Sequence, residues 1–181
     1  MSKNVAIVVG HHKFSKGAKS QWLPSEWDLM SEVAKSLCDV ADIFYHDPKI
    51  GGYTSRQRAM AKRTRLHKYV FELHYNAASP IANGCEALYY FSNKGGYKIA
   101  TKFCELVSES MEIKNRKAKP MLNSTQRGYA FVYQTNGTAI ILEPFFGTSG
   151  SDVAKFDKAK YVQVLRTLIK GLWEKYYLYY Q

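Results

Sequence analysis

The sequence predicts a single three-layer α/β domain, on three observations. Apolar, β-branched runs of strand length alternate with longer segments in which apolar residues recur at helical spacing. This alternation is typical of a sheet covered by helices. With 181 residues, 46% of them hydrophobic, the chain is large enough for one core, and no repeat or linker divides it. We therefore expect one domain over residues 1–181.

These patterns predict five strands and four helices. In chain order they are a strand at 4–9, a helix opened by residues 24 and 25, a strand at 43–46, a helix at 54–67, strands at 69–74 and 87–91, a helix at 96–111, a strand at 138–142 and a helix from 152 to about 176. The segment 113–127 is polar and rich in lysine, and we expect a loop there. The segment that follows, at 129–133, has no assigned type.

Local signals support each element of the first half. The first strand is apolar up to Gly10, where a loop rich in glycine and lysine begins. Ser25 and Asp28 have the spacing of a capping box, which predicts a helix start. The run 47–52 contains a proline and two glycines and ends the second strand. The basic segment that follows has the alanine and leucine spacing of an amphipathic helix.

Local signals also support the elements of the second half of the chain. Pro80 and Gly84 mark the loop between the third and fourth strands. The run Thr138–Leu142 is strongly apolar, as expected of a buried strand. In the last helix, Trp173 and the aromatic run at 176–180 are expected to pack at the helix end, although amphipathic aromatics also suit a membrane surface.

A formal net charge of +11 favours an anionic partner, which could be nucleic acid, a membrane surface or an acidic polymer. Charge alone does not choose among these partners. The densest basic run, Arg56–Lys68, has helical spacing, and we interpret it as a solvated helix face rather than a dedicated binding patch.

Cysteine usage and hydropathy exclude several classes of protein. Cys38, Cys85 and Cys104 are odd in number and include no C-x-x-C pair, so we expect buried thiols rather than disulfides or a cysteine metal cage. No apolar run approaches the ~20 residues of a membrane span. The apolar run at 5–9 is too short for a secretory signal, so we expect synthesis and folding in a cytoplasm.

Three reactive side chains, His11, His74 and Glu143, lie at the ends of apolar runs expected to be strands. Reactive groups gather at the carboxyl ends of strands in open α/β sheets, so the sequence points to an active site. Two imidazoles suit a hydrolytic zinc site, and Glu26 is the candidate third ligand. Its alternative interpretation is an ordinary carboxylate in the first turn of a helix. Burial would raise the pKa of Glu143 toward a value suited to a general base. The alternative role for Glu143 is that of a structural ion-pair partner.

Four other polar residues could take part in this site or be structural. His12 follows His11, but successive side chains of an extended chain point to opposite sides, so only one should reach a metal, and we prefer His11. Glu72 shares a strand face with His74 and is a candidate hydrogen-bond partner for its imidazole. The remaining histidines, His46 and His67, are expected to be structural.

Rival chemistries lack their motifs. The chain has no P-loop, no G-x-G-x-x-G and no H-E-x-x-H. The run Gly147–Ser151 lacks the spacing of a nucleophile elbow. Nothing in the sequence activates Cys85 as a nucleophile.

Five motifs in fixed order carry a family resemblance. They are Val-Gly-His at 9–11, a Glu at 26, Glu-Leu-His-Tyr-Asn-Ala at 72–77, Gly-Cys-Glu-Ala-Leu-Tyr-Tyr at 84–90 and Ile-Leu-Glu-Pro-Phe-Phe at 141–146. Together they resemble the type-3 zinc-dependent N-acetylmuramoyl-L-alanine amidases, above all the catalytic domains of phage and prophage endolysins, over nearly the whole chain. Two departures, His12 and Pro144, bear on local geometry and substrate preference.

The resemblance implies a twisted, mostly parallel central sheet with helices on both faces. It also implies one catalytic Zn²⁺ held by His11, Glu26 and His74, with Glu143 acting on the zinc-bound water. The implied reaction is hydrolysis of the amide bond between N-acetylmuramic acid and the L-alanine of the peptidoglycan stem peptide.

Three further residues have supporting or substrate-binding roles in this interpretation. Asn76 completes the family's His-x-Asn pair with His74, Glu72 stands beside the same histidine, and Arg127 could help to stabilise the oxyanion from its loop.

The biological setting implied is that of a bacteriophage endolysin, which waits in the host cytoplasm and acts in cell lysis once the membrane is permeabilised. No separate cell-wall-binding domain is evident, so the basic surface is expected to hold the enzyme near anionic wall or outer-membrane polymers. We expect a monomer without a nucleic-acid partner. Two alternatives stay open. One is a zinc peptidase that cuts within the stem peptide, and the other is a basic, non-catalytic nucleic-acid-binding protein.

Overall fold

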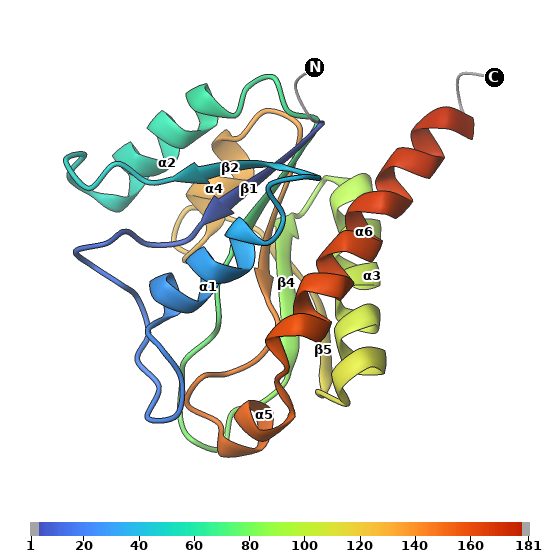
Figure 1. Cartoon of the computed structure of the whole chain (residues 1–181). Helices are drawn as coiled ribbons and strands as arrows, with labels where there is room; N and C mark the ends of the chain where they lie inside the picture. Colours follow the sequence, from blue (N-terminus) through green and yellow to red (C-terminus); the bar gives the residue numbers. More distant parts are fainter. Residues whose placement is uncertain (1–3, 179–181) are drawn as a thin grey trace.

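A six-stranded sheet runs through the centre of the computed structural model, which describes residues 4–178, with side chains as far as Trp173 (Figure 1). The strands are β1 (Val5–Val9), β2 (Asp42–Tyr45), β3 (Tyr69–Leu73), β4 (Cys85–Tyr90), β5 (Asn115–Met121) and β6 (Thr138–Glu143). The helices are α1 (Glu26–Lys35), α2 (Tyr53–Arg63), α3 (Lys94–Met111), α4 (Tyr129–Gln134), α5 (Gly150–Lys155) and α6 (Lys158–Leu178).

The strand order is β2-β1-β3-β6-β4-β5. Strands β2, β1, β3 and β6 are mutually parallel, whereas β4 runs antiparallel to β6 and parallel to β5. The expected mostly parallel sheet flanked by helices is therefore confirmed. Because β4 is reversed, its first residues meet the carboxyl ends of β1, β3 and β6 at one edge of the sheet.

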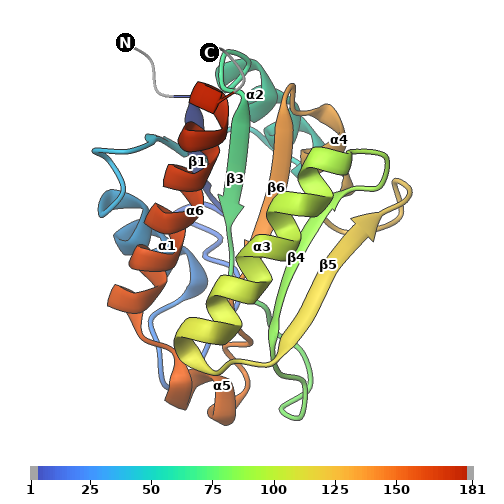
Figure 2. The same ribbon diagram turned by 90° about the vertical axis from the view of Figure 1, so that its right-hand side faces the viewer.

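Helices cover both faces of this sheet. Figure 2 looks onto the face where α3 and α6 lie, with α2 behind the strands. Along β1, Val5, Ile7 and Val9 belong to the larger core with α1, α3 and α6, and Ala6 and Val8 belong to the smaller core with α2 and α4. All five residues are fully buried, which explains why the strand reads as a continuous apolar run.

Several local signals act as expected. The Ser25 side chain caps α1 by accepting a hydrogen bond from the backbone N–H of Asp28, and its hydroxyl donates to the Asp28 carboxylate at 2.6 Å. The basic helix is also present, although it ends at Arg63 rather than His67. Among residues 4–178, no helix is both long enough and apolar enough to cross a membrane.

The expected loop at 113–127 is wrong, because β5 occupies residues 115–121 of it. Among residues 4–178 this strand pairs with β4 alone, at the edge of the sheet, where lysines and a proline are tolerated on exposed backbone. An edge strand needs no apolar alternation, so the usual signal was missing. The segment at 129–133, left without a type, forms the short helix α4.

The expectation of a single closing helix is also wrong, because Phe156 separates α5 from α6. Phe156 has an extended backbone (φ −69°, ψ 123°) between α5 and α6, and the centroid of its ring lies 4.2 Å from that of Phe145.

A third correction concerns Cys38, which is exposed, whereas Cys85 and Cys104 are buried as expected. Cys38 lies beyond the last turn of α1, where the amphipathic face has ended. The expected packing of Trp173 is wrong, because its side chain is 40% exposed near the end of α6, and the expected packing of residues 176–180 lies outside the described side chains.

Candidate active site

His11, Glu26 and His74 come together at the edge of the sheet where β1 and β3 end. Nε2 of His11 lies 3.0 Å from Oε2 of Glu26, and Nδ1 of His74 lies 2.6 Å from Oε1 of the same carboxylate. One potential ligand atom from each residue lies within 4.8 Å of the others. Glu26 comes from the first position of α1, so three separate elements supply the group.

Two glycines make this convergence possible. A Cβ atom on Gly10 would overlap the imidazole of His74, and one on Gly17 would overlap both Glu26 and His11. Gly17 also has a φ of +76°, a left-handed conformation that side chains disfavour. His11 itself adopts φ 64°, which turns the chain sharply after β1. The glycine-rich loop therefore packs directly against all three side chains.

Glu26 is held as a carboxylate. Only 3% of the residue is exposed, and burial alone would raise its pKa. Hydrogen bonds from His11 and His74 outweigh burial and lower the pKa to about 2. The backbone N–H of Ala18 also donates to Oε2 at 2.7 Å. Two imidazoles and one ionised carboxylate are the donor set of many hydrolytic zinc sites, so these residues fit that metal.

Glu72 lies behind His74, on the side away from Glu26. Its Oε2 is 3.3 Å from Nε2 of His74, and its Oε1 is 2.8 Å from Nε2 of His46. The side-chain amide of Gln57 donates to Oε1 at 3.1 Å. Burial opposes ionisation of Glu72, but the hydrogen bonds from His46 and His74 hold its pKa well below the usual range. His74 is thus held between two carboxylates.

Glu143 ends β6 beside this group. Its Oε2 is buried and makes no hydrogen bond within the described part of the chain. Burial is the largest influence and, with repulsion from Glu86 and Glu26, raises the pKa of Glu143 to about 7, against the opposing charges of His74 and Arg127. A partly buried carboxyl group that is half ionised near neutral pH, with one buried oxygen free of hydrogen bonds, is suited to proton transfer.

A second set of polar residues lines the β4 side of this edge. Glu86 lies opposite Glu143 in the β4–β6 register. Its Oε1 accepts a hydrogen bond from the Asn76 amide at 2.8 Å, and its Oε2 accepts one from Nε of Arg116 at 2.7 Å. Asn76 is therefore bound to a β4 carboxylate. Arg127 is exposed and acts on Glu143 through its charge.

The other histidines do not join the metal group. His12 has a buried Nδ1 without a hydrogen-bond partner in residues 4–178. Burial, followed by the nearby Arg56, His46 and His11, lowers its pKa. His67 is buried, with Nε2 2.9 Å from a carboxylate oxygen of Asp42.

Sequence reasoning missed His46, Gln57, Glu86 and Arg116 as neighbours of the site. For Glu86, its place two residues after Gly84 in the quoted motif was a usable signal. His46 and Gln57 carried none, because their contacts with Glu72 span 26 and 15 residues of sequence.

Comparison with known proteins identifies the family. A family model described as N-acetylmuramoyl-L-alanine amidase matches residues 5–173. A search of curated proteins gave no match.

Three solved structures illustrate the similarity of fold. The catalytic domain of the CD27L endolysin, which targets Clostridium difficile, has a TM-score of 0.76 at 21% identity, covering 92% of this chain and 96% of that one. An N-acetylmuramoyl-L-alanine amidase from Clostridium difficile 630 has a TM-score of 0.74 at 16% identity, and the match covers 96% of this chain and 97% of that one. A putative N-acetylmuramoyl-L-alanine amidase from Neisseria meningitidis has a TM-score of 0.71 at 21% identity, and the match covers 94% of each chain. The family match spans nearly the whole chain, and the chain therefore belongs to the N-acetylmuramoyl-L-alanine amidase family.

Proposed function

We propose that this protein is a zinc-dependent peptidoglycan hydrolase that cleaves the amide bond between N-acetylmuramic acid and the L-alanine of the stem peptide. One observation carries the proposal: His11, Glu26 and His74 converge beside Glu143, a partly buried carboxyl group whose Oε2 is buried and makes no hydrogen bond among the described residues. Membership of the amidase family supports the choice of substrate.

His11, Glu26 and His74 are the proposed ligands of one zinc ion. Zinc held there would polarise the scissile carbonyl and lower the pKa of a water molecule toward about 7. The ionised state of Glu26 favours this role, since its carboxylate is ready to bind a cation without first losing a proton.

Glu143 is the proposed general base and acid. Its carboxylate takes the proton from the attacking water and then gives that proton to the departing amine of L-alanine. A pKa of about 7 suits both transfers, because the group is readily ionised and readily protonated near neutral pH. A bound cation nearby would lower this pKa somewhat, which favours the base form at the start of the reaction.

The surrounding residues have positioning roles in this proposal. The carboxylate of Glu72 lies 3.3 Å from Nε2 of His74, and this charge on one side of the ring favours the orientation in which Nδ1 faces Glu26 and the metal. Asn76 is held by Glu86, and this pair forms the wall of the site on the β4 side. Arg127 contributes positive charge toward Glu143 and the developing oxyanion.

An endolysin-like role completes the proposal. The similarity to the CD27L catalytic domain supports it, and a bacteriophage lysin made in the host cytoplasm would reach peptidoglycan once the membrane is permeabilised. The net charge of +11 would favour retention near anionic wall or outer-membrane polymers.

Mass spectrometry of digested peptidoglycan tests the reaction directly. Stem peptides with a new free L-alanine amino terminus should appear, vanish with a chelator and return with zinc. Cleavage at any other bond would replace the amidase assignment by that of a peptidase.

Variants test the residue roles. Glu143→Gln should keep zinc and lose most turnover, whereas His11→Ala and His74→Ala should lose the metal. Full activity of the first variant would remove Glu143 from the mechanism, and normal zinc content in the other two would overturn the ligand assignment.

A further inference from the structure

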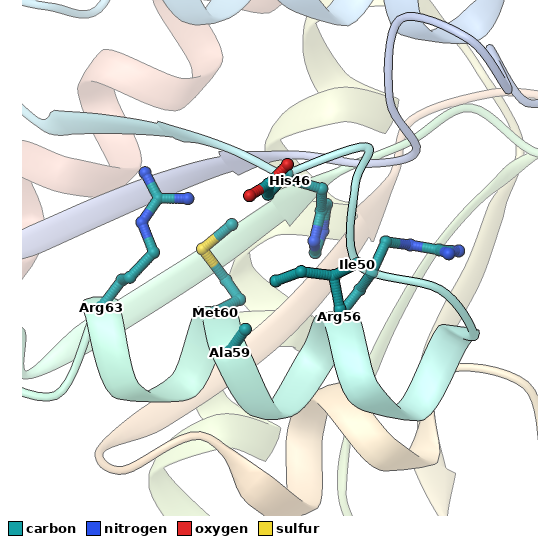
Figure 3. A pocket seen from close by; sticks show the side chains of 7 residues that line it. His46, Ile50, Arg56, Ala59, Met60 and Arg63 are labelled. Carbon is teal, nitrogen blue, oxygen red and sulfur yellow. The ribbon is translucent and has the colours of Figure 1, made fainter.

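His46 follows β2 at the same edge of the sheet as the metal group. Strands β2, β1 and β3 are parallel neighbours, so the histidines that follow them, His46, His11 and His74, gather along one row of carboxyl ends. Figure 3 shows the His46 ring reaching from the strand end toward α2, between Met60 and Arg56, where it lines a pocket of about 340 Å³. Its side chain is only 2% exposed, so it affects the metal group through its neighbours.

One neighbour, Glu72, joins His46 to a proposed metal ligand. Nε2 of His46 lies 2.8 Å from Oε1 of Glu72, and Oε2 of the same carboxylate lies 3.3 Å from Nε2 of His74. Burial opposes ionisation of Glu72, but its interactions with His46 and His74 hold its pKa well below the usual range. An ionised carboxylate can only accept hydrogen bonds, so Nε2 of His46 carries the proton and donates to Oε1.

Glu72 receives a second donor from a different element. The side-chain amide of Gln57, in α2, donates to the same oxygen at 3.1 Å. Two donors therefore hold Oε1, one from the end of β2 and one from α2. The other oxygen, Oε2, is buried and accepts no hydrogen bond among residues 4–178. The place of the Glu72 carboxylate beside the His74 ring thus depends on His46 and Gln57.

Both donors hold Glu72 while another polar atom of each stays unpaired. Nδ1 of His46 and Oε1 of Gln57 are buried, and neither has a hydrogen-bond partner in the described part of the chain. A buried polar atom without a partner is destabilising, so packing alone would favour apolar side chains at both positions. The hydrogen bonds to Glu72 are the contacts that require polar residues there.

We propose that His46 is a positioning residue for the metal group and acts through Glu72 on His74. His46, assisted by Gln57, holds the carboxylate beside Nε2 of His74. The negative charge there favours a proton on Nε2, which leaves Nδ1, the nitrogen that faces Glu26, to bind the metal. The proposal rests on the proposed function, which supplies the identity of the metal ligands.

The zinc affinity of two His46 variants tests this role, measured by competition with a chromogenic chelator. His46→Leu removes the donor and should raise the Kd for zinc by about tenfold, the lower end of the range for lost outer partners of metal ligands. His46→Gln keeps an N–H donor at the same position along the side chain and should restore most of the affinity. A wild-type Kd in His46→Leu, or an equally weak Kd in both variants, would overturn the proposal.

His67→Leu is the matched control, because His67 pairs with a carboxylate far from the metal group. It is buried, and its Nε2 lies 2.9 Å from a carboxylate oxygen of Asp42, the first residue of β2. Its loss should lower the midpoint of urea unfolding, as the loss of His46 does, and leave the Kd for zinc unchanged. A Kd raised equally in both leucine variants would mean that zinc affinity follows general stability, and the proposal would fail.

A double-mutant cycle shows whether the effect passes through Glu72. In a Glu72→Gln background, His46→Leu should change the Kd for zinc by less than about twofold, because the carboxylate that it positions is already gone. A further rise of about tenfold in that background would mean that His46 acts by another route. That result would overturn the assignment.

The outcomes separate this proposal from the proposed function. If His46→Leu binds zinc as the wild type does, the positioning role fails and the ligand assignment stands. If the wild type binds no zinc, the proposed function fails, and nitrogen NMR of the metal-free protein decides the role of His46. The ring nitrogen shifts of His74 should then change in His46→Leu and return toward wild type in His46→Gln. Shifts that are unchanged in the first variant, or equally changed in both, would refute the positioning role.

Discussion

In the metal-free protein, Glu143 should make the free energy of unfolding depend on pH in a direction opposite to that of most carboxylates. Its pKa is about 7 in the folded chain, against an ordinary value of 4.5. Each unit of difference is worth about 1.36 kcal/mol, so the whole effect is up to about 3 kcal/mol. Glu143→Gln removes it, because the amide does not titrate.

The sign follows from which state binds the proton. Below pH 4.5 the Glu143 carboxyl is protonated in both states, and its contribution is fully present. Between pH 4.5 and 7 the unfolded chain ionises and the folded chain does not, so stability is lost as the pH rises through 7. The stability of Glu143→Gln relative to wild type should therefore increase from pH 5 to pH 8, by most of the 3 kcal/mol.

Urea unfolding at several pH values, with a chelator present, measures this difference. The absolute stability of the variant is less informative, because a buried amide carries its own hydrogen-bonding cost at every pH. Glu109→Gln, at an exposed position on α3, is the matched control and should stay parallel to wild type. Parallel stability curves for Glu143→Gln and wild type would refute the reasoning, because they would mean that Glu143 has an ordinary pKa in the fold.

Three further predictions follow from the contacts described above. Glu72→Gln should weaken zinc binding by about 10- to 100-fold, measured by competition with a chromogenic chelator, because the carboxylate that orients His74 is lost; unchanged affinity would show that Glu72 does not position the ring. Gly17→Ala should reduce zinc content, measured by elemental analysis, since the new Cβ would overlap Glu26 and His11 at a left-handed position; wild-type content would contradict the packing. Ser25→Ala should lower the free energy of unfolding in urea by about 1 kcal/mol through loss of the α1 cap, and an unchanged midpoint would mean that the cap is not needed.

The buried parts of the fold could be predicted because parallel strands covered on both faces leave a clear mark in sequence. The runs that end near His11, His74 and Glu143 are apolar for this reason, and the same rule indicated that the three side chains share an edge. Strand β5 escaped prediction because an edge strand is exposed and needs no apolar face. The break at Phe156 escaped because that ring packs on Phe145, a tertiary contact that helical periodicity does not reveal.

The candidate site was predictable only in its innermost part. His11 and His74 could be proposed from residue type and place in the chain, because metal chemistry restricts both, whereas the choice of Glu26 as the third ligand depended on the family resemblance. The surrounding contacts depend on register and topology. Glu86 reaches Asn76 because β4 is antiparallel to β6, and His46 reaches Glu72 because β2 and β3 flank the same strand.

The reversal of β4 also determines where this enzyme can vary without losing its chemistry. The chain leaves the sheet at the end of β3 and re-enters it at the start of β4 along the same edge, so the connection at 74–84 needs no crossover helix through the molecule. Ala78 in this connection donates a backbone hydrogen bond to the Thr148 hydroxyl, in the segment before α5, so residues added or removed between 77 and 83 would alter contacts with that segment. His11 follows β1, Glu26 begins α1, His74 follows β3 and Glu143 ends β6, so these four elements hold the metal group and Glu143 in place. The length of this connection can therefore change while the elements that carry the metal group keep their places in the sheet.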